Sequence, residues 1–217
     1  MMERLAVSWW PGTLAPRGDG LYVIGVRGDG DREQARRRIR QALCEALAQL
    51  YGLQAVQIMI HFSAGRAPAV SFLEAPDAVP PGISISHDGP LSLAAIHQHG
   101  PVGVDVMRVQ EVPDWRAIAR DYLPPHVLDQ MESSAPTQRP LLLAQAWTEM
   151  EARLKCHGRQ LGEWSGLALP AQCHGLVLPE GYAGMIAAYT LHGAAVRETA
   201  SQASQSPGRA QMVRPAP

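Results

Sequence analysis

The sequence lacks a charge bias. Its 217 residues include 19 Lys and Arg against 20 Asp and Glu, so the formal net charge is −1 at pH 7. This balance gives no reason to expect nonspecific binding to nucleic acid or to a membrane surface, and an anionic ligand must be held by a local group of side chains. Because 46% of the residues are hydrophobic and 18% are charged, the chain is expected to be mostly globular, with one sizeable core or two small ones.

Cysteine is also scarce. The three cysteines, at positions 44, 156 and 173, form no CxxC pair. An odd number of widely spaced cysteines indicates no disulfide framework and favours a reducing compartment. The eight histidines do not combine with the cysteines in the spacing of a zinc site.

Long apolar runs are missing too. No run reaches the length of a membrane helix. The apolar stretch 5–10 is too short for the hydrophobic region of a signal peptide, and Pro11 interrupts it. We therefore expect a soluble, cytoplasmic protein.

The pattern of apolar and turn residues predicts an α+β order of elements. The most distinct element is a helix over 31–51, with Asp31 as its N-cap and Gly52 as its stop. Further helices are expected over 114–122, 125–131 and 139–157, the last with an apolar stripe of Leu143, Trp147, Met150 and Leu154. Strands are expected over 5–10, 20–26, 56–62, 69–72, 83–86, 91–96, 102–106, 166–169, 176–178 and 185–191, with 83–106 forming a meander.

This order hints at two similar α/β halves with a boundary near 107–113. The predicted division is an N-terminal lobe over 1–108 and a C-terminal lobe over 109–194. The remaining segment, 195–217, is rich in Ser, Gln, Ala and Pro and is expected to be a disordered tail.

Candidate chemistry begins on the helix over 139–157. Thr148, Glu151 and Lys155 stand at i, i+3 and i+7 and share one face. A Glu–Lys pair four residues apart is by itself common surface decoration. Asp105 ends the apolar strand over 102–106, where a turn aspartate is the ordinary interpretation. Together, a carboxylate pair and a lysine would offer oxygen ligands for a hard cation and a positive charge for a phosphate.

Three more segments could hold an anion. Ser86 and His87 precede the predicted turn at Asp88-Gly89, where hydroxyls, backbone N–H groups and an imidazole can bind phosphate, although a plain hairpin turn is the favoured interpretation of this segment alone. Arg66 lies in what looks like an ordinary loop. The helix over 31–51 carries a cluster of arginines, for which a solvated polar face is the favoured interpretation: Arg36, Arg37, Arg38 and Arg40.

The order and spacing of these segments resemble the 4′-phosphopantetheinyl transferases of the surfactin-synthetase type. The family's motifs are a Gly-Lys/Arg-Pro loop, an Ile-Ser-His turn, a Val-Gly-Val-Asp-x-Glu strand and a final Trp-Ser/Thr-x-Lys-Glu-x-x-x-Lys helix. In this chain they read Gly65-Arg66-Ala67-Pro68, Ile85-Ser86-His87, Val102-Gly103-Val104-Asp105-Val106-Met107 and Trp147-Thr148-Glu149-Met150-Glu151-Ala152-Arg153-Leu154-Lys155. The resemblance covers roughly residues 20–190.

The resemblance implies two pseudo-symmetric α/β lobes with the active site between them. It implies an enzyme of the holo-acyl-carrier-protein synthase type, which moves phosphopantetheine from coenzyme A to a serine of an apo acyl or peptidyl carrier protein and releases 3′,5′-ADP. By resemblance, Asp105 and Glu151 would hold Mg²⁺, Glu151 and Lys155 would be catalytic, and coenzyme A would be bound by Arg66, Ser86, His87, Asp105 and Lys155.

The sequence departs from the family pattern at two methionines. Met107 stands where the family often has a second acid, and a thioether is too soft a ligand for Mg²⁺. Water and phosphate oxygens could complete the shell instead. Met150 replaces a lysine and removes a positive charge near the phosphates. These methionines leave open a second function, a non-catalytic homologue that binds coenzyme A or a carrier protein.

The carrier's serine lies at the start of an acidic helix, so an apolar and basic surface should receive it. Arg116, Arg120, Tyr122 and Leu123 are the candidates for that surface. By analogy with the pseudo-duplicated fold, we expect a monomer.

Overall fold

The computed structural model describes residues 4–15, 17–63, 66–74, 78–189. Its helices are α1 (Arg32–Tyr51), α2 (Trp115–Tyr122), α3 (Pro125–Ser133) and α4 (Arg139–Cys156), with short 3₁₀ turns η1 (Ala55–Gln57) and η2 (Pro136–Gln138). Its strands are β1 (Arg4–Ala6), β2 (Ser8–Trp9), β3 (Leu21–Arg27), β4 (Ile58–His61), β5 (Ala69–Phe72), β6 (Gly82–Asp88), β7 (Leu91–His97), β8 (Val102–Arg108), β9 (Gln172–Val177) and β10 (Tyr182–Ala188). None of the described helices combines the length and the apolarity needed to cross a membrane.

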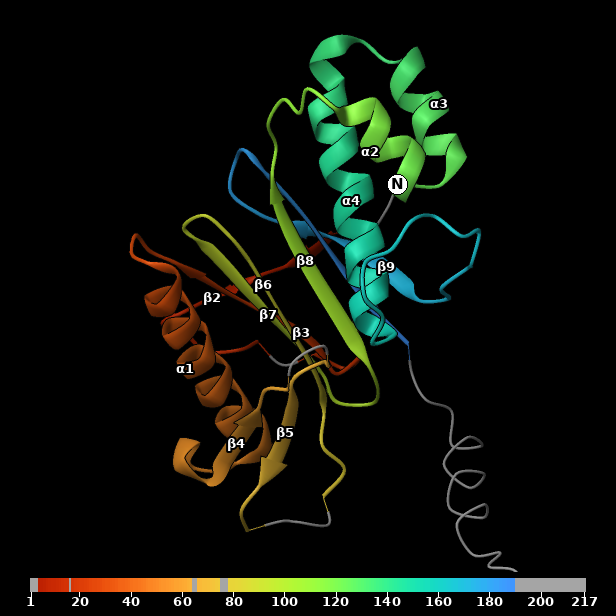
Figure 1. Ribbon diagram of the computed structural model, residues 1–217. Coiled ribbons are helices and arrows are strands. Elements are labelled where there is room, and N and C mark those ends of the chain that lie inside the picture. Colours follow the sequence, from red (N-terminus) through yellow and green to blue (C-terminus); the bar gives the residue numbers. More distant parts are fainter. Residues whose placement is uncertain (1–3, 16, 64–65, 75–77, 190–217) are drawn as a thin grey trace, which may run out of the picture.

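Two four-stranded sheets form the centre of the molecule (Figure 1). One has the strand order β2-β3-β7-β6 and the other β1-β9-β10-β8. Their facing sides share one hydrophobic core, which includes Val23 and Leu93 from the first sheet and Val104 and Ile186 from the second. The helix α1 covers the outer face of the first sheet, and α4 covers the outer face of the second. The layers therefore run α1, sheet, sheet, α4.

The two sheets share a connectivity. In chain order, each sheet has a strand, then a long helix, then a two-stranded hairpin: β3, α1, β6, β7 in one and β8, α4, β9, β10 in the other. The last strand of each set, β7 or β10, lies between the other two and pairs antiparallel with both. The N-terminal strand β1 pairs in parallel with β9, so the first residues of the chain complete the sheet built from its C-terminal part.

Local sequence explains α1 well. The Asp31 side chain accepts a hydrogen bond from the Gln34 N–H, and Gly52 ends the helix at a φ of 65°, a left-handed conformation that glycine adopts without a Cβ penalty. Ile39, Leu43 and Leu47 are completely or almost completely buried against the sheet. The predicted helix over 31–51 is confirmed to within one residue.

The helix α4 packs differently. Its most buried face is a row of small residues, Ala144, Thr148, Ala152 and Cys156, which lies on β8 and β10. The predicted stripe of Leu143, Trp147, Met150 and Leu154 lies to one side of this row, where all but Leu154 belong to a core with α2 and α3. The stripe was thus read correctly as apolar, but it packs mainly on helices rather than on the sheet.

Several predicted strands needed correction. The stretch 5–10 is divided between β1 and β2, which belong to different sheets. The meander over 83–106 is wrong at its third strand, because β8 leaves β7 and pairs with β10. Residues 166–169 form no strand. The predicted tail over 195–217 and the end of the predicted strand 185–191 lie outside the described residues.

Candidate functional site

The strands β6 and β8 each lie at one edge of their sheet, and the candidate site lies where they meet. Here the Lys155 Nζ of α4 donates to Asp105 Oδ1 of β8 at 2.6 Å and to the Val104 carbonyl at 3.2 Å. Asp105 is buried, with 7% of its surface exposed. A buried carboxylate requires such partners, because an unpaired charge inside a protein is costly.

Gly103 explains how a lysine on the helix can reach an aspartate on the strand. A Cβ atom at this position would collide with the backbone carbonyl oxygen of Ala152 and the backbone nitrogen of Cys156. A side chain here would therefore hold the helix away from the strand. Because alternate residues of a strand face the same side, Asp105 points toward α4 as Gly103 does. Asp105 lies in the middle of β8, not at a strand end as predicted.

Two serines of β6 connect the two sheets at this seam. The Ser86 hydroxyl donates to Asp105 Oδ1 at 2.7 Å, and the Ser84 Oγ accepts the Val104 N–H at 3.1 Å. Both serines are buried. Ser86 thus fixes the carboxylate that Lys155 also holds. The predicted turn geometry was wrong here, because Ser86 and His87 are paired with β7 inside the strand and the turn begins only after Asp88.

Glu151 lies one helical turn before Lys155 and is partly buried. Burial raises the pKa of its carboxyl group above the ordinary value of 4.5; the charge of Lys155 lowers this pKa, and the charge of Asp105 raises it further. The structure therefore brings Glu151, Asp105 and Lys155 into one electrostatically coupled group. All three come from sequence segments that were predicted to meet.

The donor set of this group fits a hard cation. Asp105 and Glu151 offer carboxylate oxygens, the kind of ligand that Mg²⁺ binds, and their mutual repulsion is of the kind that a divalent cation relieves. Among the described residues, no group of three or more His, Cys, Asp or Glu side chains could hold a metal by itself. Met107 follows Asp105 by two residues on β8 and adds no oxygen ligand. The residues therefore fit a cation that takes its other ligands from phosphates and water.

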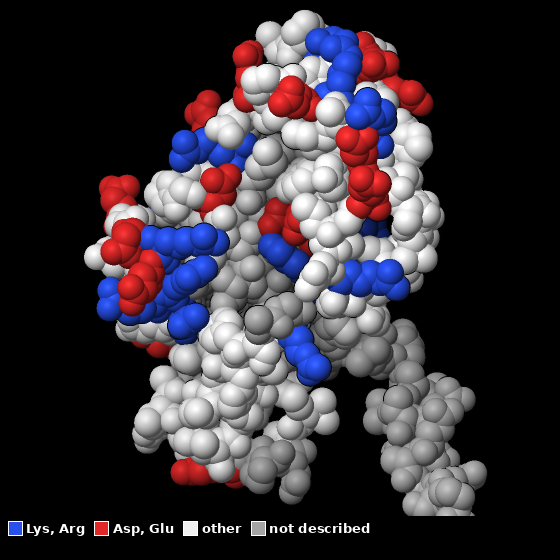
Figure 2. All heavy atoms as spheres, viewed as in Figure 1, with Lys and Arg blue, Asp and Glu red and all other residues white. Residues whose placement is uncertain are grey.

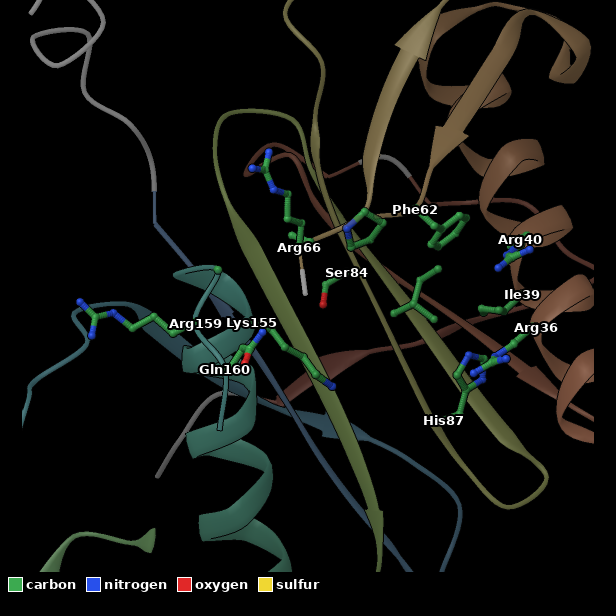
Figure 3. Close-up of a pocket in the computed structure, with 14 residues that line it drawn as sticks. Arg36, Ile39, Arg40, Phe62, Arg66, Ser84, His87, Lys155, Arg159 and Gln160 are labelled. Carbon is green, nitrogen blue, oxygen red and sulfur yellow. The ribbon is translucent and has the colours of Figure 1, made fainter. Parts of the chain in front are cut away.

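A cavity of about 420 Å³ opens beside this group. Figure 3 shows that its side chains come from α1, β6, the β4–β5 region and the end of α4. The basic side chains on its wall are Arg36, Arg40, Arg66, Lys155 and Arg159, and His87 lies with them. In the space-filling view, Lys and Arg side chains gather over α1 at the edge of a hollow in the surface (Figure 2). The chain thus concentrates positive charge here despite its net charge of −1.

This positive charge affects the pKa of His87. Burial lowers the pKa of its imidazole below the ordinary value of 6.5, and the nearby charges of Arg36, Arg32, Lys155 and Arg40 lower it further. Its Nδ1 lies 2.8 Å from the Ser92 hydroxyl oxygen, which fixes the ring. A group of cations that disfavours one more positive charge is suited to an anion with several charges.

Sequence reasoning missed part of this cavity. Arg36 and Arg40 were read as belonging to a solvated face, and both are indeed exposed, yet they also form its wall. Phe62, which packs under the Arg40 guanidinium at 4.1 Å from the ring centroid, and Gln160 were not considered. The spacing of four residues between Arg36 and Arg40 was the available signal, because it places both on one side of the helix.

A second cavity, of about 700 Å³, lies beside the first. Arg159 and Gln160 line both cavities, so the two share a wall. The second cavity is walled by α4, by the start of α3 and by residues 159–170, and its apolar side chains include Met150, Leu154, Trp164 and Leu167. Met150 belongs to the apolar part of this wall, and the charged side chains Glu149, Arg153, Arg159 and Glu163 also line the cavity. We call it the apolar cavity after the first group.

The predicted carrier surface is only partly present. Leu123 is fully buried in the core between α2, α3 and α4, so its assignment to the surface was wrong. Leu123 is the residue that ends α2, and its side chain packs into this core instead of facing solvent. Arg116 and Arg120 are exposed, but they pair with Glu132 and Asp121 respectively. Tyr122 is partly buried and packs edge-on against Trp147.

Comparison with known proteins agrees with this site. Residues 101–182 match the family model described as the 4′-phosphopantetheinyl transferase superfamily. The matched segment includes β8, with Asp105, and α4, with Glu151 and Lys155. Over this part of its length the chain is therefore similar to that superfamily.

A relative in Synechocystis sp., described as "Putative 4'-phosphopantetheinyl transferase", is 28% identical to the chain over 90 residues. The aligned region is 42% of this chain and 37% of the relative. The match thus spans little more than a third of the relative's length.

Proposed function

We propose that the protein transfers the 4′-phosphopantetheine group from coenzyme A to a serine of an apo acyl or peptidyl carrier protein and releases 3′,5′-ADP. The observation that carries the proposal is the group of Asp105, Glu151 and Lys155 beside a basic cavity. The superfamily match over 101–182 includes these three residues and supports the same conclusion.

The two adjacent cavities suit the two halves of coenzyme A. Its nucleotide and phosphates would occupy the basic cavity with Arg36, Arg40, Arg66 and His87. Its less polar arm would extend past Arg159 and Gln160, which line both cavities, into the apolar one. A ligand with a charged end and a long, largely uncharged arm would thus meet matching surroundings along its length.

The reaction replaces one P–O bond with another. The carrier's serine oxygen attacks the phosphorus next to the pantetheine arm, and the bond to the bridging oxygen breaks. Glu151 would accept the serine proton, directly or through a water. Lys155 would neutralise charge that develops on the leaving phosphate.

Asp105 and Glu151 would hold Mg²⁺ with phosphate oxygens and water as the remaining ligands. The bound ion would draw charge from the phosphorus under attack. Ser86 keeps the Asp105 carboxylate in one orientation through its 2.7 Å hydrogen bond. Lys155 donates to the same oxygen, so it also neutralises Asp105 in the free protein.

The finer assignments are part of the same proposal. We assign the chain to the surfactin-synthetase type and to holo-acyl-carrier-protein synthase activity, as a cytoplasmic monomer. The expected lobes over 1–108 and 109–194 need a different boundary, because β1 and β8 both pair within the second sheet. The shared order of strand, long helix and hairpin in both sheets supports a pseudo-symmetric pair of lobes with the site between them.

The test is to incubate the protein with coenzyme A, Mg²⁺ and a panel of apo carrier proteins and to measure carrier mass. We expect one carrier to gain one phosphopantetheine group. No gain on any carrier, where a reference transferase modifies them, would refute the proposal.

A second function has one observation in its favour. Met107, on the strand that carries Asp105, leaves the group one carboxylate short of the family pattern. A homologue that binds coenzyme A or a carrier without transfer would show calorimetric binding of coenzyme A that is independent of Mg²⁺. Turnover that requires Mg²⁺ would exclude it.

A further inference from the structure

The segment 159–171, which we call the strap, has no helix or strand and still forms one wall of the apolar cavity. Such a segment has no ladder of backbone bonds to fix its position, so its contacts with other elements must do so. Its backbone is held near its start by the Arg159 N–H, which donates to Leu154 O at 2.9 Å. In its middle, the Trp164 N–H donates to Asp121 O at 2.7 Å.

The end of the strap is held mainly by one side chain. Arg153 of α4 uses Nη1 to donate to the carbonyls of Leu169 at 2.8 Å and Ala171 at 3.1 Å. On the other side of the guanidinium, Nε and Nη2 both donate to Glu149 Oε1, at 3.1 and 2.8 Å. His157 adds a contact of 3.0 Å from Nε2 to the Pro170 carbonyl. Every nitrogen of the guanidinium is therefore engaged.

We call the Arg153 guanidinium, with its bonds to the Leu169 and Ala171 carbonyls, the clamp. Glu149 orients the clamp and neutralises its charge. The side chains of Arg153 and Glu149 are 29% and 32% exposed, so the pair is only partly screened by solvent. Because a guanidinium is planar, fixing its Glu149 edge also directs its other edge at the two strap carbonyls. A lysine at this position would have three donors on one atom and could not reproduce both edges.

The clamp belongs to the apolar cavity and not to the basic one. Arg153 and Glu149 line the cavity of about 700 Å³ and are absent from the wall of the cavity of about 420 Å³. The strap side chains Trp164 and Leu167, 38% and 46% exposed, face the same apolar space. Moving the end of the strap would change the shape of this cavity while leaving Arg36, Arg40 and His87 in place.

We propose that Arg153 is a positioning residue that sets the strap and thereby the affinity of the enzyme for the pantetheine arm of coenzyme A. This inference rests on the proposed function, since it takes the arm to occupy the apolar cavity. It assigns to Arg153 a role separate from phosphate binding, even though its side chain is a cation two residues from both Glu151 and Lys155.

The experiment compares two ligands, coenzyme A and adenosine 3′-phosphate 5′-diphosphate, which keeps every phosphate of coenzyme A and lacks only the pantetheine arm. In calorimetric titrations, Arg153→Gln should weaken coenzyme A binding about tenfold and leave binding of the armless nucleotide unchanged. Arg153→Lys, which keeps the charge but not the fork, should show a smaller loss of about threefold. The control is Arg116→Gln, which removes another glutamate-paired arginine, at 64% exposure on α2, outside both cavities.

A second measurement reads the strap without any ligand. Amide hydrogen exchange over 161–171 should accelerate in Arg153→Gln and stay unchanged in Arg116→Gln. An equal loss of affinity for both ligands, or unchanged exchange in the strap, would overturn the assigned role. If the wild-type protein binds neither ligand, the proposed function fails and takes the assignment of the arm with it. In that case the exchange measurement still decides separately whether Arg153 holds the strap.

Discussion

The two long helices cover the outer faces of the two sheets, but the side chains packed between helix and sheet are large under α1 and small under α4. We call these side chains the thick layer and the thin layer respectively. Beneath α1 are large aliphatic side chains, including Ile39, Leu43 and Leu47. Beneath α4 are small residues, and Gly103 allows the helix backbone to approach the strand. The thick layer leaves α1 with long cationic side chains at the edge of a cavity, whereas the thin layer brings Lys155 to within 2.6 Å of Asp105.

This difference separates two tasks. Groups that must act on one another at hydrogen-bond distance come from the closely packed helix and strand. Groups that only need to attract a charged ligand come from the helix on the thick layer, because Coulomb attraction extends over a longer distance. Changes at the contact between α4 and β8 should therefore affect turnover and stability, and changes on the α1 side should affect ligand affinity.

The largest effect is expected at Glu151. Glu151→Gln removes the proton acceptor while preserving shape, so transfer to the carrier should fall by about 10²- to 10⁴-fold. Steady-state transfer with saturating coenzyme A measures this loss. Glu132→Gln, at an exposed glutamate paired with Arg116, should keep nearly full activity. Wild-type turnover in Glu151→Gln would remove the assigned role.

The next effect tests the thin layer itself. Gly103→Ala should destabilise the protein by about 3 kcal/mol, because the new Cβ meets backbone atoms of α4 that cannot move aside cheaply. Urea unfolding measures this change. Gly175→Ala on β9 of the same sheet is the matched control, since its Cβ would lie 3.6 Å from the Arg4 side chain, an ordinary contact. Equal losses at the two glycines would contradict the close-packing account.

The difference between the two helices also explains what could be predicted from the sequence. The helix α1 carries its own signals, a cap at Asp31, a stop at Gly52 and large apolar residues at helical spacing. The deepest face of α4 is made of Ala, Thr and Cys, which carry a weak hydrophobic signal, so the larger stripe beside it attracted attention instead. Local pattern could find the helix but not the surface on which it packs.

The candidate site was foreseeable for a similar reason. Asp105, Glu151 and Lys155 could be proposed as a group because the spacing of a motif can be read without knowledge of the fold, and the structure brings the three together. Two other features depend on contacts between distant segments and could not be read from local pattern. They are the pairing of β8 with β10 in the second sheet and the apolar cavity that the strap lines. Arg36 and Arg40 were predicted to lie on a solvated face, and both are exposed. That they also line a cavity was not predicted, because an exposed side chain and one that lines an open cavity follow the same helical pattern.

A moderate effect is expected on the thick layer. Arg36→Gln and Arg40→Gln should each weaken coenzyme A binding about tenfold, with little change in unfolding free energy, because each removes a cation from the cavity wall. Calorimetric titration at fixed ionic strength checks this. Arg37→Gln, on the same helix but outside the cavity wall, should bind like the wild type. Equal weakening in all three variants would indicate a general charge effect instead of a site.

The smallest effect concerns stability and pH. Because the pKa of Glu151 is raised in the folded protein, the wild type loses stability as pH rises from the ordinary value of 4.5 through the raised one. Glu151→Gln removes this loss, so it should be slightly more stable than the wild type at neutral pH and indistinguishable below pH 4.5. Thermal unfolding at several pH values measures the difference. A variant less stable than the wild type at neutral pH would contradict the burial argument.

The central claim, that α4 and β8 hold a phosphopantetheinyl transfer site, has one direct measurement. Carrier mass and released 3′,5′-ADP are followed together after mixing the protein with coenzyme A, Mg²⁺ and an apo carrier. The account predicts one 3′,5′-ADP for each phosphopantetheine gained, and loss of both signals in Glu151→Gln. An unmodified carrier across the panel, or equal modification by Glu151→Gln, would contradict it.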